Sequence, residues 1–455
     1  METQDQNPNP MQQPPQSPGF FQSSTAKIIM VGLLTLVLLI PLQFVKSLIF
    51  ERAERQKEVV TEINNKWGED VYFYGPILKV PYTQYYETKF VDDKTKKVTI
   101  QRSESTEFAY FFPDQLNADL NVNTQQKNRN NYESVVYTSK MDFKGNYSFP
   151  SFDSQAIPKE NIHFDKASII IKTNTIKSIT GSVTVSINGK KHTFEPVQNN
   201  NEKDTVSTLE TNAFDIKSAF ENGPAPFDFN INYKGSEQIK IVPIGKMTQA
   251  KMTSNWPSPS FDGNFLPETN TITDEGFNAF WKVSHLNRPF AQQHFGTLPS
   301  LSEYSFDVKF LIPIDQYQQN ERAAKYGFLV IGLTFLVFFL IQSVSKINIH
   351  VFQYSMIGLA LIMFYTLLIS ITEHSSFMLA YLIAGLSVIV MITLYSLSIL
   401  KNKKFAGFIA IALSALYIFI YVIIQLENYA LLVGSIGLFL ILGAVMYFSR
   451  KIEWK

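Results

Sequence analysis

The sequence predicts a membrane protein of mixed α+β class, with one N-terminal transmembrane helix, a large antiparallel, sandwich-like β domain and a C-terminal bundle of five transmembrane helices. Three observations lead to this prediction. Of the 455 residues, 45% are hydrophobic and 17% are charged, a balance typical of a chain with both lipid-embedded and water-exposed parts. Long uncharged runs begin near residue 28 and again near residue 326. The segment between these runs alternates polar and apolar residues, as half-buried strands do.

The N-terminal part contains three predicted segments. Residues 1–25 are rich in Gln, Asn, Pro and Ser, which predicts a disordered cytoplasmic tail. The first transmembrane helix is expected over 26–50, because a span needs about 20 apolar residues and no charge occurs over 28–45. A cleaved signal peptide is the alternative, but the tail is long and no A-x-A-like site follows. Residues 51–70 predict a helical stalk with acids and bases three and four apart.

The β domain is predicted over residues 71–313. The sequence FDFNINY (227–233) places four apolar residues on one face of a strand, and YSFDVKFLI (304–312) has the same period of two. Two alternating runs meet at Asn188-Gly189, a dipeptide that accepts the positive φ of a tight hairpin turn. The irregular stretch at 255–267 is interpreted as a structural loop, with binding as the alternative. No βαβ alternation suggests a nucleotide-binding sheet.

The C-terminal part, 314–455, predicts five spans joined by short connections, with Asp315 capping a helix that runs directly into lipid. Short connections make successive helices antiparallel neighbours. Gly434, Gly437 and Gly443 are interpreted as close-packing points. The predicted spans are 326–344, 351–371, 377–400, 405–424 and 429–448, followed by a short cytoplasmic C-terminus.

The Lys/Arg bias of the short loops predicts the orientation of the spans. One side carries Lys346, Lys401, Lys403, Lys404, Arg450, Lys451 and Lys455, whereas the loops at 372–376 and 425–428 have no Lys or Arg. The lysine-rich side is therefore expected to be cytoplasmic. Six spans then place both termini in the cytoplasm and residues about 51–322 outside.

Several kinds of chemistry are not predicted. A formal charge of +1 offers no basic excess for nucleic acid, and the absence of Cys removes thiolate sites. No nucleotide-binding, zinc-protease or serine-hydrolase motif occurs. Three S-x-x-K triplets are attributed to chance, and the histidines show no ligand spacing. We therefore expect neither an enzyme nor a cofactor or metal.

Two turns on the outer side of the membrane carry the candidate site residues. Glu373 and His374 lie between two apolar runs, and Glu427 lies in the other outer turn. At the interface an ionised side chain needs no special explanation, unlike one at the bilayer centre. The three residues are interpreted as an outer-rim interaction cluster. Solvated turns, docking of the β domain, and a metal or proton site all stay open.

Several strings resemble the CreD family of bacterial inner-membrane proteins. They include FERAERQKEVV, YGPILKVPY, IPIDQYQQNERAAKYGFLVIGLTFLVFFL and QLENYALLVGSIGLFLILGAVMY, and the resemblance covers roughly residues 28–455. It implies an inner-membrane protein with a periplasmic domain that supports envelope integrity and stress tolerance. It lends no catalytic residue. We expect the bilayer and an envelope lipid or protein as partners; a stress sensor or a carrier of an apolar envelope precursor are the alternatives.

Overall fold

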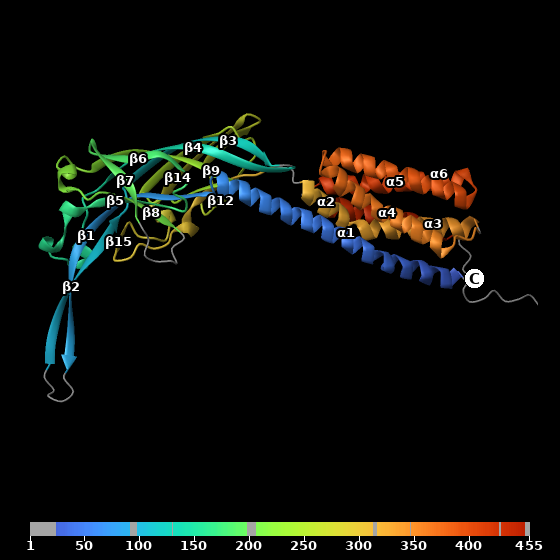
Figure 1. The fold of residues 1–455 in the computed structure, drawn as a ribbon, viewed down its shortest axis with the longest axis horizontal. Helices are drawn as coiled ribbons and strands as arrows, with labels where there is room; N and C mark the ends of the chain where they lie inside the picture. Colours follow the sequence, from blue (N-terminus) through green and yellow to red (C-terminus); the bar gives the residue numbers. More distant parts are fainter. Residues whose placement is uncertain are drawn as a thin grey trace, which may run out of the picture. The chain divides into compact units, whose positions relative to one another are not determined.

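The computed structural model describes residues 24–91, 98–129, 131–197, 206–312, 316–345, 347–426 and 429–450. These residues form two compact units, which are described separately below (Figure 1). The β unit comprises Lys57–Pro313, and the membrane unit comprises Met1–Gln56 and Ile314–Lys455. Residues 1–23 of the predicted tail and Asp315 lie outside the described residues.

Within the described residues, the β unit contains a 16-stranded sheet. The main hydrogen-bonding order is β12-β16-β10-β1-β5-β8-β7-β6-β9-β4-β3-β11-β14-β13, and β2 joins β1 and β15. The strands are β1 (Val71–Val91), β2 (Val98–Phe111), β3 (Gln115–Arg129), β4 (Tyr132–Tyr147), β5 (Ser168–Thr173), β6 (Ile179–Ile187), β7 (Lys190–Val197), β8 (Ser207–Thr211), β9 (Ala225–Ser236), β10 (Gln238–Ile241), β11 (Met247–Ser254), β12 (Pro259–Gly263), β13 (Thr269–Thr273), β14 (Gly276–Ser284), β15 (Gln293–Phe295) and β16 (Phe306–Phe310).

The predicted local patterns appear in these strands. In β9 the alternate residues Phe227, Phe229, Ile231 and Tyr233 are buried, as their period of two predicts. The β6–β7 hairpin turns at Asn188 and Gly189, whose φ angles are 47° and 82°. Positive φ at both central residues gives the turn the twist of its flanking strands, so the hairpin prediction is confirmed.

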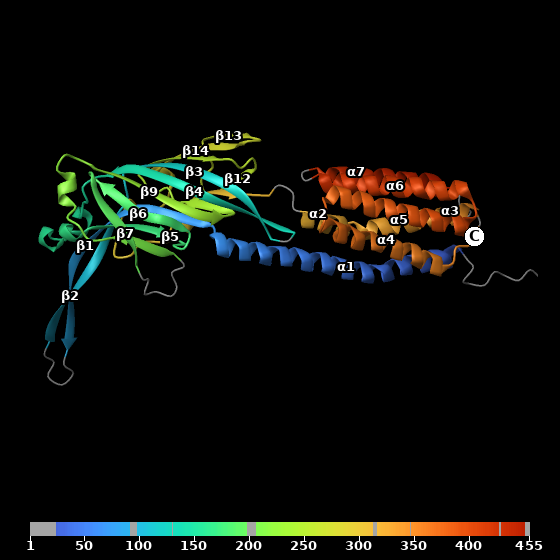
Figure 2. The ribbon, with the colours of Figure 1, turned by 45° about the horizontal axis from the view of Figure 1, so that its top comes forward.

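The sheet folds over, so that strands far apart in its order pack face to face (Figure 2). Phe73 of β1 stacks across the fold on Phe143 of β4 with ring centroids 4.7 Å apart, and Phe143 stacks on Phe229 of the neighbouring strand β9 at 4.8 Å. Elsewhere Trp281 of β14 stacks on Phe306 of β16 at 4.8 Å. These fully or nearly fully buried rings form one continuous core, and the sandwich-like class is confirmed.

Three details of the β unit differ from the expected pattern. β1 pairs with β10 in parallel, and β11 pairs with β3 in parallel, whereas antiparallel pairing was expected throughout. Parallel neighbours need a long connection, and more than a hundred residues separate each of these pairs. The expected irregular stretch 255–267 also contains β12, which pairs with β16. Local alternation identifies strands but does not determine such distant partners.

Helix α1 (Ser24–Trp67) ends within the β unit. The Ser134 hydroxyl donates a hydrogen bond of 2.6 Å to Asn64 Oδ1, and Trp67 Nε1 donates to the carbonyl oxygen of Tyr137 at 3.2 Å. The ammonium groups of Lys127 and Lys234 lie 4.9 and 5.3 Å from the Trp67 ring. The last turns of the helix are thus fixed to β4 by hydrogen bonds and to β3 and β9 by cation–π contacts.

The membrane unit contains the first part of α1 and helices that follow the β unit. Among the described residues, six helices are long and apolar enough to cross a membrane, which confirms one N-terminal and five C-terminal spans. A short helix, α2, precedes the five C-terminal spans. It ends at Lys325 and α3 begins at Gly327, so the expected single helix into lipid is interrupted. The helices are α2 (Gln316–Lys325), α3 (Gly327–Ser345), α4 (Val351–Thr372), α5 (Phe377–Leu400), α6 (Lys403–Gln425) and α7 (Ala430–Ser449).

Two glycines let α1 pack closely in the membrane unit. A Cβ on Gly358 of α4 would lie 2.2 Å from Leu38 Cδ1, and one on Gly327 would lie 2.8 Å from Leu42 Cδ1. Leu38, Leu42 and Ile49 are buried in the same core as α3, α4 and α5. In lipid the hydrophobic effect does not drive helices together. They associate through close packing instead, which small residues such as glycine allow.

Candidate functional site

Glu373 terminates α4 at the turn to α5. Its backbone N–H donates to the carbonyl oxygen of Ile369, and its side chain lies 3.4 Å from Arg52 of α1, measured from Oε1 to Nε. Both residues belong to the membrane unit. The Glu373 side chain is 23% exposed and that of Arg52 is 44% exposed, so water weakens this ion pair. The pair nevertheless connects the first span to the C-terminal bundle.

Helix α2 covers the same end of the bundle. With its amide oriented to satisfy its surroundings, the Gln316 side chain donates to the carbonyl oxygens of Ser375 (3.2 Å) and Thr372 (3.3 Å). Arg322 Nη1 donates to the carbonyl oxygen of Ile424 at the end of α6. These contacts satisfy carbonyls at the ends of α4 and α6 and one carbonyl in the turn that follows α4. We call this end of the membrane unit, defined by α2, Arg52 and Glu373, the α2 end.

Two polar atoms at the α2 end are buried without a partner among the described residues. They are Asn320 Oδ1 and Gln319 Oε1, both on α2. Asn320 is completely buried, and its amide nitrogen donates to the carbonyl oxygen of Gln316. Unpaired buried oxygens are costly, so both atoms call for a hydrogen-bond donor. The sequence predicted one helix running directly into lipid, and did not reveal α2 as a separate helix with polar residues.

The three residues of the predicted cluster are placed differently. Glu373 faces α1, whereas His374 is exposed and its side chain has no hydrogen bond among the described residues. Glu427 lies outside the described residues. No group of three potential metal ligands occurs in the described part of the chain. Docking of the β domain at Glu373 stays a prediction, and the contact present in the structure is with Arg52.

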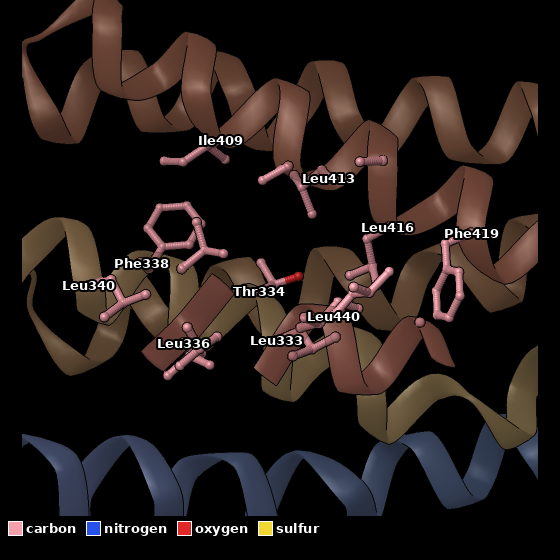
Figure 3. A pocket seen from close by; sticks show the side chains of 16 residues that line it. Leu333, Thr334, Leu336, Phe338, Leu340, Ile409, Leu413, Leu416, Phe419 and Leu440 are labelled. Atoms are coloured by element: carbon pink, nitrogen blue, oxygen red, sulfur yellow. The ribbon is translucent and has the colours of Figure 1, made fainter. Parts of the chain in front are cut away.

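An apolar cavity of about 380 Å³ lies between α3, α6 and α7 (Figure 3). Its walls include Leu333, Phe338, Leu413 and Leu440, and the Thr334 hydroxyl is buried there without a partner among the described residues. Gly437 of α7 also lines the cavity and approaches Phe419, so close packing is confirmed at this glycine. A cavity of this composition suits a hydrocarbon chain.

The β unit has a polar cleft of about 880 Å³ on the face opposite its core. Residues of β3, β4, β6, β7, β9, β11 and β14 line it, and most of them are outward residues, because alternate residues of each strand point away from the buried face. Acidic and basic side chains both contribute, and Lys140 lies 3.3 Å from Asp142 beside it. The charged lining residues are Asp119, Asp142, Asp228, Lys144, Lys191 and Lys251.

The histidines of the β unit do not gather into a site. His163 Nε2 is 2.8 Å from the Thr83 hydroxyl, His192 stacks on Phe214 and His294 packs against Phe112. Burial lowers the pKa of His192 and of His294 below the usual value, because desolvation disfavours the imidazolium. These contacts suit neutral structural histidines.

The spans and the inserted sheet define a multi-pass membrane protein with a β-sheet domain between its first and second spans. The family model described as "Inner membrane protein CreD" matches residues 23–455. The chain therefore belongs to the CreD family of inner membrane proteins. Inner membrane protein CreD of Escherichia coli (strain K12) is 29% identical over 430 residues, which cover 92% of this chain and 91% of the relative. The family resemblance seen in the sequence is confirmed over both units.

Proposed function

We propose that the chain supports the integrity of the bacterial envelope, without catalysis, by holding its β unit at the outer face of the inner membrane. The observation that carries this proposal is the double covalent tether. The β unit at Lys57–Pro313 is preceded by the α1 span and followed by five further spans. A domain attached at both ends meets ligands of the membrane surface at a high effective concentration.

The charge distribution supports a periplasmic β unit and cytoplasmic termini. Lys401, Lys403 and Lys404 lie at the α5–α6 connection, which is at the opposite end of α6 from Ile424 and the α2 end. Short loops rich in Lys remain on the cytoplasmic side. Residues about 51–322 are then periplasmic, where they meet envelope lipids and proteins.

The β unit has surfaces suited to such partners. β1 and β2 extend as a two-stranded ribbon beyond the other strands of the unit (Figures 1 and 2). Its side chains Tyr85, Val98 and Ile100 are each more than half exposed. Exposed apolar side chains on a paired ribbon, together with the polar cleft, supply contact area for a protein or a lipid headgroup.

Dye entry into cells tests the envelope role. Cells lacking the gene, challenged with a detergent and a cell-wall antibiotic, are expected to admit more of a membrane-impermeant dye than the parent strain, and the intact gene is expected to restore the barrier. An unchanged barrier in the deletion strain would contradict the proposal. Altered stress-gene transcription with normal dye entry would favour a regulator instead.

A carrier of an apolar envelope precursor is the second candidate function. The cavity between α3, α6 and α7 supports it, because its wall is almost entirely hydrocarbon (Figure 3). A carrier is expected to move its substrate across reconstituted vesicles. Absence of flux there would remove this candidate and leave the envelope role intact.

A further inference from the structure

A second cleft, lined by both polar and apolar side chains, lies between α1 and α2 within the membrane unit. Its volume is about 340 Å³, at the lower end of the roughly 300–1,000 Å³ that small-molecule sites occupy. α1 contributes Gln43, Lys46, Ser47 and Phe50 to the lining, and α2 contributes Glu321. The cleft therefore presents one cation, one carboxylate, two neutral polar groups and an aromatic ring.

The polar side chains that α1 contributes to the cleft make no hydrogen bond or ion pair with the residues that the structure describes. Gln43, Lys46 and Ser47 are three and four residues apart and so lie on one face of the helix. Lys46 is half-buried. An ammonium held in such a position without an acceptor calls for an anionic partner.

The carboxylate on the other wall is also available. Glu321 pairs with Lys325 one helical turn further along α2 at 3.0 Å, and both side chains are more than half exposed. Exposed pairs at this spacing are worth only about 0.3–0.5 kcal/mol, so Glu321 can exchange Lys325 for another cation. The cleft thus offers a site for a negative group and a site for a positive group.

The cleft lies near the end of the first predicted span, where Phe50 is 63% exposed and charged residues follow from Glu51. Leu42 packs against Gly327, the first residue of α3, and Lys46 follows Leu42 by one turn. On the N-terminal side of Lys46, the α1 side chains Ile40 and Phe44 are 60% and 73% exposed. Apolar side chains facing lipid with a lysine just beyond them mark the boundary between acyl chains and headgroups.

We infer that this cleft binds the headgroup of a zwitterionic, amine-bearing phospholipid. The Lys46 ammonium and the Gln43 and Ser47 donors face the phosphate, and the Glu321 carboxylate accepts hydrogen bonds from the lipid ammonium. The acyl chains then follow the exposed apolar face of α1. Charge complementarity selects a phosphoethanolamine headgroup over phosphoglycerol, which lacks the cation, and over phosphocholine, whose methylated nitrogen cannot donate. This site is separate from the proposed envelope function.

Lipid titration of the full-length protein in detergent tests the inference. Thermal unfolding is followed while phosphatidylethanolamine, phosphatidylcholine or phosphatidylglycerol is added, and an apparent affinity is obtained for each lipid. We expect the ethanolamine lipid to bind best. Lys46→Gln is expected to weaken its binding about tenfold, as loss of a charge-assisted hydrogen bond does. Glu321→Gln is expected to remove the preference for ethanolamine over choline while leaving phosphate binding.

Two controls make these outcomes decisive. Lys404→Gln removes an exposed cation at the start of α6, about 30 Å along that helix from the α2 end, and is expected to leave lipid affinities unchanged. Soluble phosphoethanolamine is expected not to compete, because it lacks the acyl chains. Equal affinity for the three lipids, or an unchanged preference in both cleft variants that unfold normally without lipid, would overturn the inference.

Discussion

Phe143→Ala is expected to lower the free energy of unfolding of the β unit by about 3–5 kcal/mol. The Phe143 ring is completely buried and stacks between Phe73 of β1 and Phe229 of β9, at centroid distances of 4.7 and 4.8 Å. Truncation removes both contacts and leaves a cavity where the two halves of the folded sheet meet. The loss of unfolding free energy is therefore expected to exceed that for an aromatic residue with contacts in one layer of the sheet only.

Denaturant unfolding of the full chain, followed by tryptophan fluorescence, measures this loss. Three of the four tryptophans, Trp67, Trp256 and Trp281, belong to the β unit. Tyr85→Ala is the matched control, because Tyr85 is an aromatic residue of β1 that is 51% exposed. We expect the control to change stability by no more than about 0.5 kcal/mol. Similar losses in both variants would contradict the described core.

Gly358→Leu is expected to destabilise the membrane unit by about 1–3 kcal/mol. Even the first side-chain atom at this position would lie 2.2 Å from Leu38 Cδ1 and 3.0 Å from Phe335 Cζ. A leucine therefore forces α1 away from α4, and packing is the main force that holds helices together in lipid. Thermal aggregation of the detergent-solubilised protein, followed by size-exclusion chromatography, measures the change.

A second substitution that should restore stability, and a control substitution, test whether the loss in Gly358→Leu comes from the contact with α1. Leu38→Ala removes the clashing methyl groups and is expected to restore part of the stability lost in Gly358→Leu. Gly332→Leu, on α3, is expected to be tolerated, because an added Cβ there meets nothing within 4 Å. Equal destabilisation at both glycines, without rescue by Leu38→Ala, would show that α1 does not pack on α4 through Gly358.

Hydropathy and alternation predicted the number of spans and the individual strands because both are local properties of the chain. The parallel partners of β1 and β3 could not be predicted in this way, since each pairing joins segments far apart in the sequence. Similarly, the glycines at 434, 437 and 443 suggested close packing, but an added Cβ on Gly443 meets nothing within 4 Å, whereas Gly358 was missed. Composition does not reveal which face of a span meets another helix.

The candidate site was predicted only in part for the same reason. Position at a turn between two spans indicated that Glu373 lies near the membrane boundary, but not that Arg52 of the first helix lies beside it. The cleft lined by Lys46 and Glu321 joins residues more than 270 positions apart, so no local pattern could reveal it. The signal that was available is Lys46, which directly follows the first uncharged run.

The proposed location of the β unit, outside the inner membrane, is tested most directly by thiol labelling. The chain has no Cys, so each introduced cysteine is its single thiol. Ser103→Cys lies on an exposed position of β2, and Lys403→Cys lies on an exposed position at the start of α6. With a membrane-impermeant maleimide on spheroplasts, we expect Ser103→Cys to be labelled at once and Lys403→Cys only after permeabilisation. Labelling of Lys403→Cys, but not Ser103→Cys, in intact spheroplasts would place the β unit in the cytoplasm and contradict the proposed envelope role.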